Sequence, residues 1–418
     1  MHARPAAITG LGAVSGCGFG VAQLWRGLLS GQTSVREVTR FDHRLHRTHN
    51  AAEVPLLEWP EPDEPLTTAL HLLSSPAHSS LCDRFALYAA REAWQHSGLP
   101  EPAKLQPRLG VFFGSSTGGM LEAEEWFAGM LDGRGRSRIS AMAAQQTNAP
   151  GDLVARLFRA GGPVLTISSA CASATLALGS ALDALRAGEV DIAIAGGADS
   201  LCQLTYAGFN ALRSVDPVAT RPFRRDRVGL SLGEGAAVLV LESLEHAGRR
   251  GAKTLGLLSG AGAACDAHHM TAPDPSGSGA ARAIHAALED AQLPPAAIDF
   301  INAHATGTPH NDVAEWAAFA QVFGARVASI PITATKATVG HFLGSAGAVE
   351  AVATVMCLLE GVLHPAPAGG DIDPHAPADL VLGAPRRHAA LHHALSTNLA
   401  FGGSNGAVVL SHPSSMPL

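Results

Sequence analysis

One cysteine of this chain stands in a local pattern that favours nucleophilic chemistry. Cys171 lies in the run LTISSACASATLALGSALDAL, where a short apolar segment passes into a long pattern of small and apolar residues. This order predicts a strand followed by a helix, with the thiol at the helix N-terminus, where unpaired N–H groups and the helix dipole favour the thiolate. An isolated cysteine is more often a buried core residue, so the assignment depends on the rest of the chain.

Two further segments place histidines in loops that follow predicted strands. His304 stands in INAHATGTPHND, shortly before the hydroxyl side chains of Thr306 and Thr308, and His341 stands in ITATKATVGHFLGSAGAVE. A single histidine is more often structural. Two histidines that each follow a strand and sit among Gly, Thr and small residues are typical of active-site loops.

Three other residues accompany these groups. Lys336 precedes His341 by five positions, and Glu350 follows in the next predicted helix. Taken alone, Lys336 would be expected to be exposed. Phe401 lies in NLAFGGSNGAVVL, in a glycine turn between two predicted strands, where flexible backbone and free N–H groups meet a large ring.

The elements that must position these residues alternate along the chain. Short runs rich in Val, Ile and Ala, apolar throughout, predict strands that start near Pro5, Leu109, Val164, Asp191, Ala236, Leu255, Asp299, Ile332 and Ala394. Amphipathic patterns predict helices over residues 83–98, 174–188 and 347–361, the first with Asp83 as its cap. Strands buried on both faces with helices between them indicate an α/β protein. Residues 43–80, rich in His and Pro, are expected to be loop or cap structure.

Composition excludes several classes of function. The 418 residues are 47% hydrophobic and 16% charged, which is enough for one large domain or two fused ones. A net charge of -7 without runs of like charge speaks against nucleic-acid binding. Arg221, Arg224, Arg225 and Arg227 form a local basic segment, which we expect to be a solvated loop.

The cysteine pattern and the apolar segments indicate a cellular setting. Six cysteines are scattered without metal-like spacing, which favours reduced thiols, and no signal-peptide pattern or apolar stretch of about 20 residues is evident. We therefore expect a soluble, cytoplasmic protein without a membrane span.

Taken together, the motifs resemble those of a known family. SSACASA, HATGTPHND, the K…GH…GSAG…E segment and FGGSN resemble, in order, the signature set of β-ketoacyl-acyl-carrier-protein synthases of the elongating type, in the thiolase superfamily. ITGLGAVSGCG, LGEGAAVLVLE and DAHHMTAPDPSG resemble further motifs of that family, so the likeness extends from about residue 6 to residue 412.

The resemblance implies a fold, partners and a reaction. The fold would be thiolase-like, with two similar halves, residues 1–253 and 254–418, forming a five-layered α-β-α-β-α core. The reaction would be decarboxylative Claisen condensation of an acyl thioester with a malonyl thioester, both carried by acyl carrier protein. No metal or organic cofactor is implied. A homodimer would be expected, and a heterodimer with a related subunit stays open.

The resemblance also assigns roles to residues. Cys171 would carry the acyl group, with the N–H groups of Cys171 and Phe401 as oxyanion hole, and His304 and His341 would hydrogen-bond the malonyl thioester oxygen. Lys336 and Glu350 would support the histidines. The remaining residues would bind substrate: Thr306 and Thr308 the phosphopantetheine arm, Asp266 and Thr271 the same tunnel, and Gly402 with Phe401 the gate to the acyl pocket.

Departures from the family pattern leave alternatives open. Ala400 replaces a glycine beside Phe401, which predicts altered gating and chain selectivity, and Arg224 and Val228 stand where the family has acidic residues. A specialised polyketide or pigment synthase fits as well as a fatty-acid enzyme. A non-catalytic chain-length-determining partner would lack Cys171. A thiolase would carry a second cysteine near the C-terminus, and a hydrolase would need a G-x-S-x-G elbow or a Cys-His-Asn order.

Overall fold

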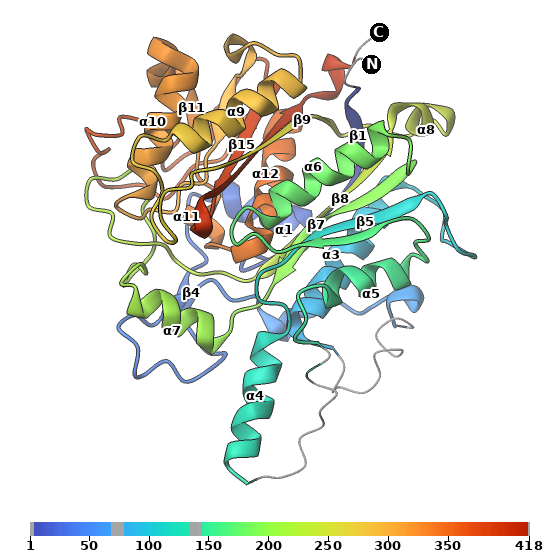
Figure 1. The fold of residues 1–418 in the computed structure, drawn as a ribbon, viewed down its shortest axis with the longest axis horizontal. Coiled ribbons are helices and arrows are strands. Elements are labelled where there is room, and N and C mark those ends of the chain that lie inside the picture. The colour runs from blue at the N-terminus through green and yellow to red at the C-terminus, as the bar shows by residue number, and fades with distance from the viewer. Residues whose placement is uncertain (1–3, 68–78, 134–141, 143, 417–418) are drawn as a thin grey trace.

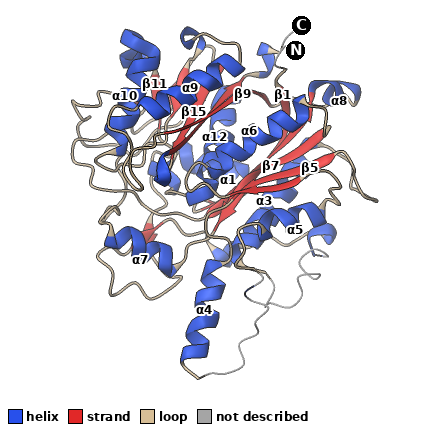
Figure 2. Cartoon of the chain, in the orientation of Figure 1, coloured by secondary structure: helices blue, strands red, loops and turns tan. Residues whose placement is uncertain are grey.

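One twelve-stranded sheet runs through the protein (Figures 1 and 2). The computed structural model describes residues 4–67, 79–133, 142 and 144–416. The strands lie in the order β13 (Asp379–Leu380), β11 (Pro331–Thr333), β10 (Phe300–Asn302), β15 (His393–Leu399), β16 (Ser404–Ser411), β9 (Gly256–Cys265), β1 (Ala6–Ser15), β8 (Gly235–Ser243), β7 (Ile192–Asp199), β5 (Leu109–Gly114) and β6 (Val164–Ile167), with β2 (Gly18–Phe19) paired to β1.

The two halves of this sheet repeat one pattern of strand directions. In the first, β1 is antiparallel to β8, β8 is antiparallel to β7, and β7, β5 and β6 are parallel. In the second, β9 is antiparallel to β16, β16 is antiparallel to β15, and β15, β10, β11 and β13 are parallel. The halves join where β1 pairs with β9. The predicted similarity of two halves is thus visible in the topology.

Helices complete five layers. α6 (Ser173–Arg186) and α12 (Ala346–Glu360) pack against each other between the two halves of the sheet. α3 (Leu81–Ser97) and α5 (Ala149–Leu157) cover the outer face of the first half, and α9 (Ser278–Asp290) and α10 (Asn311–Phe323) lie on that of the second (Figure 1). The expected thiolase-like α-β-α-β-α arrangement is confirmed.

Shorter elements fill the connections. The remaining helices and strands are α1 (Val21–Leu29), α4 (Met120–Leu131), α7 (Gln203–Ala211), α8 (Leu244–Arg249), α11 (Lys336–Val339), β3 (Arg36–Glu37), β4 (Asn50–Ala51), β12 (Val362–Leu363) and β14 (Arg386–Arg387), with 3-10 turns at Leu56–Glu58, Pro295–Ala297, Gly324–Ser329, Leu343–Ser345, Phe401–Gly403 and Pro413–Ser415. All nine predicted strands are present. Each starts within one residue of its predicted start; β10 stops at Asn302, and Lys336 already begins α11.

One helical segment has the length and hydropathy of a membrane span. Within the described residues, Leu343–Glu360 averages a hydropathy of 1.5, but 83% of it is buried inside the protein. Its helix α12 contacts β8 and β15, one strand from each half of the sheet. The apolar composition of this segment therefore matches its place in the central layer of the core.

The basic segment 221–227 is not the solvated loop that we expected. Arg224 is buried, with Nε donating to the carbonyl of Gly369 at 2.7 Å, and Arg227 is buried with its guanidinium paired to Asp373 at 2.5 Å. Arg225 is exposed as expected, and the side chain of Arg221 is 41% exposed. Buried guanidinium groups need fixed acceptors, so these arginines hold loops together.

The start of α3 corrects the predicted cap. Ser80, not Asp83, is the N-cap: its hydroxyl accepts the N–H of Asp83, while the Asp83 carboxylate accepts the N–H of Ser80 at 2.8 Å. Asp83 thus takes the third helical position of a capping box, which satisfies two N–H groups that the helix leaves unpaired. The sequence SSLCD contains both residues of the capping box, but Ser80 is the N-cap and Asp83 is the third residue of the helix.

We predict that Ser80→Ala lowers the free energy of unfolding by about 1 kcal/mol, because the N–H of Asp83 loses its acceptor in a buried position. Urea denaturation followed by circular dichroism measures the change. Ser329→Ala, at an exposed hydroxyl that caps no helix N-terminus, is the matched control and should change stability little. Equal stability of the two variants would contradict the assigned cap.

Candidate active site

Cys171 lies in a tight connection between β6 and α6. Ala170 has a positive φ of 44°, and the hydroxyl of Ser173 donates to the Ala170 carbonyl while accepting the N–H of Ser169 at 2.8 Å. The helix begins at Ser173, two residues beyond the thiol. The predicted strand-to-helix elbow is therefore present, and its left-handed residue turns the Cys171 side chain into the interior, where it is 7% exposed.

Burial opposes the preference for the thiolate that the helix N-terminus predicts. Burial raises the pKa of Cys171 to about 11, although the charge of Lys336 and the N–H groups of Phe401 and Cys171 facing the sulfur lower it. Desolvation outweighs the helix end because it acts on the whole charge of the anion. At neutral pH the resting group is the thiol.

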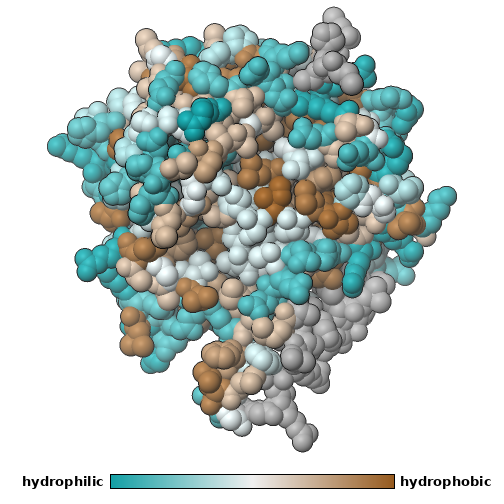
Figure 3. All heavy atoms as spheres, in the orientation of Figure 1, coloured by the Kyte–Doolittle hydropathy of each residue, from teal (hydrophilic) through white to brown (hydrophobic). Residues whose placement is uncertain are grey.

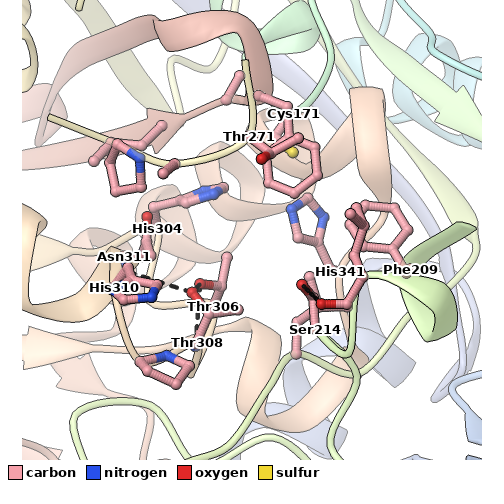
Figure 4. Close-up of a pocket in the computed structure, with 18 of the residues that line it drawn as sticks. Cys171, Phe209, Ser214, Thr271, His304, Thr306, Thr308, His310, Asn311 and His341 are labelled. Atoms are coloured by element: carbon pink, nitrogen blue, oxygen red, sulfur yellow. Dashed lines mark hydrogen bonds between the residues drawn. The ribbon is translucent and has the colours of Figure 1, made fainter. Parts of the chain in front are cut away.

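The two predicted histidines come from different elements and meet this thiol (Figure 4). His304 follows β10 and His341 follows α11, and both are buried. Their rings are 5.3 Å apart at 87°, edge to face. The sulfur of Cys171 and one nitrogen of each ring all lie within 4.8 Å of one another. The structure therefore brings together three residues that are 170 positions apart at the extremes.

Hydrogen bonds fix the tautomer of His341. Its Nδ1 accepts the N–H of Leu343 at 3.0 Å, so the ring proton is on Nε2. Nε2 is buried and has no partner among the described residues. Burial and the charge of Lys336 hold the pKa of His341 well below its usual range, so the ring is neutral. An unpaired buried N–H is costly, and here it faces the thiol pocket as a free donor.

His304 is fixed in the same tautomer. Lys336 Nζ lies 3.0 Å and Asn398 Nδ2 lies 3.2 Å from His304 Nδ1, and both groups are donors. Nδ1 therefore accepts, and Nε2 carries the proton. Burial and the charges of Lys336 and His341 also hold the pKa of His304 well below its usual range. Both rings thus present N–H donors in the neutral state.

Lys336 and Glu350 form a buried ion pair behind the histidines. Lys336 Nζ donates to Glu350 Oε1, and Asn398 Nδ2 donates to Glu350 Oε2 at 2.7 Å. Lys336 is 2% exposed and Glu350 is fully buried, so the exposure expected of an isolated lysine was wrong. Asn398, at the end of β15, was missed. It bonds both Glu350 and His304, and the hydroxyl of Thr175 on α6 donates to its Oδ1.

Glu315 is a second residue that sequence reasoning missed. From α10 its carboxylate accepts the N–H groups of His304 at 2.7 Å and Ala305 at 2.8 Å, and the hydroxyl of Thr397. Burial raises its pKa to about 7. Ala305 has a positive φ of 43°, so this carboxylate holds the strained turn that follows His304. An acidic residue within an apolar helix was the only signal available.

Cysteine and histidine at this spacing are also typical zinc ligands, but the set fits a cation poorly. The Nε2 atoms that face the sulfur carry protons, since each Nδ1 is occupied as an acceptor. A metal ligand needs an unprotonated ring nitrogen and a thiolate. The ammonium group of Lys336, 3.0 Å from His304, would in addition repel the ion.

A pocket of about 380 Å³ leads from Cys171 to the surface (Figure 4). The predicted Thr271, Thr306 and Thr308 line it, and the hydroxyls of Thr306 and Thr308 lie 3.0 Å apart. Asp266 also borders the pocket, but its carboxylate accepts from Asn405 Nδ2 at 2.7 Å, so it tethers the neighbouring turn. The mouth is thus lined by hydroxyl groups suited to a polar, extended ligand.

Phe401 and Gly402 form a turn beside the thiol. The ring of Phe401 borders the pocket, and Gly402 has a φ of 84° and donates its N–H to the carbonyl of Met270 at 2.8 Å. Ala400 is extended (φ -117°, ψ 153°), a conformation that alanine adopts without strain, so the replacement of glycine costs nothing in this state. Its effect on other conformations of the turn stays a prediction.

The duplicated five-layered fold, with a cysteine and two histidines at the meeting of its halves, defines a thiolase-like protein. Residues 3–247 match the family described as "Beta-ketoacyl synthase, N-terminal domain" and residues 255–368 match "Beta-ketoacyl synthase, C-terminal domain". The chain therefore belongs to the β-ketoacyl synthase family, as the motifs indicated.

Individual relatives agree over nearly the whole chain. The chain is 36% identical to "3-oxoacyl-[acyl-carrier-protein] synthase 2" of Synechocystis sp., covering 95% of each protein. It resembles the solved structure "The ishigamide ketosynthase/chain length factor" (TM-score 0.90, 33% identity, 98% and 99% covered). It also resembles "AntDE:AntF (apo): type II PKS acyl-carrier protein in complex with its ketosynthase bound to the hexaketide" (TM-score 0.86, 28%, 98% and 99%).

We predict that alkylation of Cys171 by iodoacetamide rises with pH without a plateau below about pH 10. Burial raises the pKa of this thiol to about 11, so the reactive thiolate fraction grows about tenfold per pH unit below that value. Peptide mass spectrometry follows the labelling, with the exposed thiol of Cys265 in the same sample as internal reference. A plateau near neutral pH would show that the helix end, not burial, dominates.

Proposed function

We propose that the protein joins acyl chains by decarboxylative Claisen condensation, with Cys171 as nucleophile and acyl carrier protein as the carrier of both substrates. The observation that carries the proposal is the pair of fixed Nε2–H donors on neutral His304 and His341, beside a buried thiol. Such a pair suits a developing negative charge on a thioester oxygen, which is the requirement of decarboxylation to an enolate.

The first half-reaction would load the enzyme. The sulfur of Cys171 attacks the acyl thioester carbonyl, and the carrier leaves as a thiol that takes up the proton of Cys171. The N–H groups of Cys171 and Phe401, which face the sulfur, would stabilise the oxyanion of the tetrahedral intermediate. Donors aimed in this way are worth about 3–4 kcal/mol each. Because burial raises the pKa of the thiol, loading depends on this proton transfer.

The second half-reaction would extend the chain. His304 and His341 donate hydrogen bonds to the thioester oxygen of the malonyl group, CO₂ leaves, and the electron pair of the broken bond remains as the enolate. Its carbon attacks the acyl carbonyl on Cys171. Collapse of the intermediate releases a 3-oxoacyl thioester and the Cys171 thiolate, which takes up one proton. The carboxylate of the substrate supplies the electrons, so the step needs no cofactor.

The other predicted residues would bind and support. Lys336 and Glu350 would hold His304 in its donor tautomer, as their hydrogen bonds indicate. Thr306, Thr308 and Thr271 would bind the phosphopantetheine arm in the pocket mouth. Asp266 and Gly402 would act through the turn that carries Phe401, a more indirect role than the one first expected. Residues 1–253 and 254–418 would form the two halves.

A dimer is supported by two exposed apolar surfaces of this chain. β6 is an edge strand of the sheet with Val164 and Leu165 both 42% exposed. α4 projects from the body (Figure 1) and exposes Phe127, Met130 and Leu131, and Figure 3 shows a brown, apolar area on this projecting part of the surface. Unpaired strand edges and apolar helix faces are costly in water.

We propose that the protein forms a homodimer in the cytoplasm. The ishigamide neighbour, a ketosynthase with a chain length factor, supports a heterodimer as the alternative.

We predict that purified protein gains the mass of an acyl group when mixed with acyl-carrier proteins of differing length and unsaturation. Addition of malonyl-carrier protein should then release CO₂ and a product longer by two carbons. Cys171→Ala should abolish loading, because no nucleophile remains. Intact-mass spectrometry of protein and carrier measures both steps.

The histidine variants provide the matched control of this experiment. His304→Ala and His341→Ala should lower CO₂ release by at least about 100-fold while Cys171 still loads, because each removes one oxyanion donor. If the folded wild-type protein takes up no acyl group, the catalytic role of Cys171 is overturned. A chain-length-determining partner subunit would then be favoured. The acyl group that loads fastest would distinguish a fatty-acid enzyme from a polyketide enzyme.

We further predict that Ala400→Gly broadens the range of acyl chains that load, because glycine restores backbone freedom beside Phe401. Loading rates across the same carrier panel measure the effect. An unchanged order of acyl preference would count against a role of Ala400 in gating.

A further inference from the structure

We infer that Phe209 is a positioning residue for acyl transfer: its ring holds Phe401, and thereby the N–H of Phe401 that faces the sulfur of Cys171. This inference rests on the proposed function and adds a residue to it. Phe209 lies on α7 and borders the same pocket as Phe401. Their ring centroids are 5.5 Å apart with an interplanar angle of 30°, a stacked pair (Figure 4 shows Phe209 beside the pocket).

Hydrogen bonds hold the residues on either side of Phe401: the N–H of Ala400 donates to the carbonyl of Ser404 at 2.8 Å, and that of Gly403 donates to the carbonyl of Ala400 at 3.0 Å. Gly402 donates to the carbonyl of Met270, and the carbonyl of Gly403 accepts the N–H of Asp266, both at 2.8 Å. Gly402 and Gly403 have φ values of 84° and 80°, where glycine has wide freedom. In the part of the chain that the structure describes, the N–H of Phe401 donates to no backbone carbonyl, and it faces the sulfur of Cys171. Among the described residues, the one aromatic contact of the Phe401 ring is Phe209.

α7 provides a rigid platform for this contact. Tyr206 on its inner face is fully buried, and Asn210 Oδ1 accepts both the N–H of Thr48 at 3.0 Å and its hydroxyl at 2.9 Å. At the other end, Glu124 of α4 accepts the N–H groups of Gln203 at 2.8 Å and Leu204 at 2.6 Å. Hydrogen bonds therefore hold the helix at both ends, buried ones at Asn210 and exposed ones at Glu124, and they fix the position from which the Phe209 ring projects.

The consequence is specific to one of the two half-reactions. The N–H of Phe401 faces the sulfur and would serve the oxyanion of acyl transfer, whereas decarboxylation would use the Nε2–H donors of His304 and His341. Neither histidine depends on Phe209 for its hydrogen bonds. Loss of the stack should therefore slow acyl transfer and leave decarboxylation intact, a separation that general damage to the fold would not produce.

The test compares these two rates in Phe209→Leu, which keeps an apolar side chain but removes the ring. We expect the maximal rate of Cys171 acylation, with the acyl-carrier protein that loads fastest, to fall about two- to tenfold, the range that an aromatic pair supports. Release of CO₂ from malonyl-carrier protein alone should stay within twofold of wild type. Phe209→Tyr, which keeps the ring, should restore the acylation rate.

Phe41→Leu is the matched control. The Phe41 ring packs against Tyr206 on the same helix, with centroids 5.3 Å apart, and none of the aromatic ring contacts within the described residues joins it to Phe401. It should lower thermal stability as Phe209→Leu does, and leave acylation unchanged. The inference fails if Phe209→Leu lowers both rates equally or neither, or if Phe41→Leu slows acylation as much. A wild-type protein that neither loads nor releases CO₂ would instead overturn the proposed function.

Discussion

The buried ion pair between Lys336 and Glu350 is the interaction on which the rest of the site depends. Two charges removed from water are costly unless each finds its partners, and here both groups have partners beyond each other. Glu350 accepts from Lys336 with one oxygen and from Asn398 with the other. A further N–H group of Lys336 Nζ donates to His304 Nδ1. The pair therefore neutralises itself and, in doing so, decides which nitrogen of His304 carries the proton.

The duplicated fold explains how such a cluster forms between distant segments. α6 and α12 lie together in the central layer, and Cys171 precedes one while His341 precedes the other. The two helices approach closely at Gly347, where a Cβ would lie 2.0 Å from Thr175 Oγ1. Thr175 in turn donates to Asn398. A larger residue at Gly347 would separate the helices and with them the thiol from the histidines, which makes glycine necessary there.

Sequence patterns predicted the elements and the reacting groups better than the environment of those groups. Most of the predicted strands are buried on both faces and have clear apolar runs, and all nine were found. Cys171 follows β6 and His304 follows β10, whereas His341 follows the short helix α11. The parts that failed depend on contacts between distant residues. Nothing near Lys336 in sequence shows that it pairs with Glu350, or that Asn398 bonds both Glu350 and His304.

The same limit explains three other differences. We expected Arg224 to be in solvent because a segment with four arginines within seven positions is normally exposed. Instead Arg224 is buried, and carbonyl groups of a loop 145 residues away accept its hydrogen bonds. Asn398 and Glu315 carry no local motif, since their roles arise only where β15 and α10 pass His304. For Cys171 the helix end was visible in the sequence, whereas the depth of burial that opposes it was not.

These environments leave a site that carries little charge at rest and is arranged for charge that develops during reaction. With the thiol protonated and both histidines neutral, the charges of Lys336 and Glu350 behind them cancel. In a buried site, N–H donors already fixed in direction need no reorganisation when an oxyanion forms, and water does not weaken them. The donors fall into two sets, backbone N–H groups facing the sulfur and Nε2–H groups opposite. Acyl transfer and decarboxylation can therefore be stabilised separately around one sulfur atom.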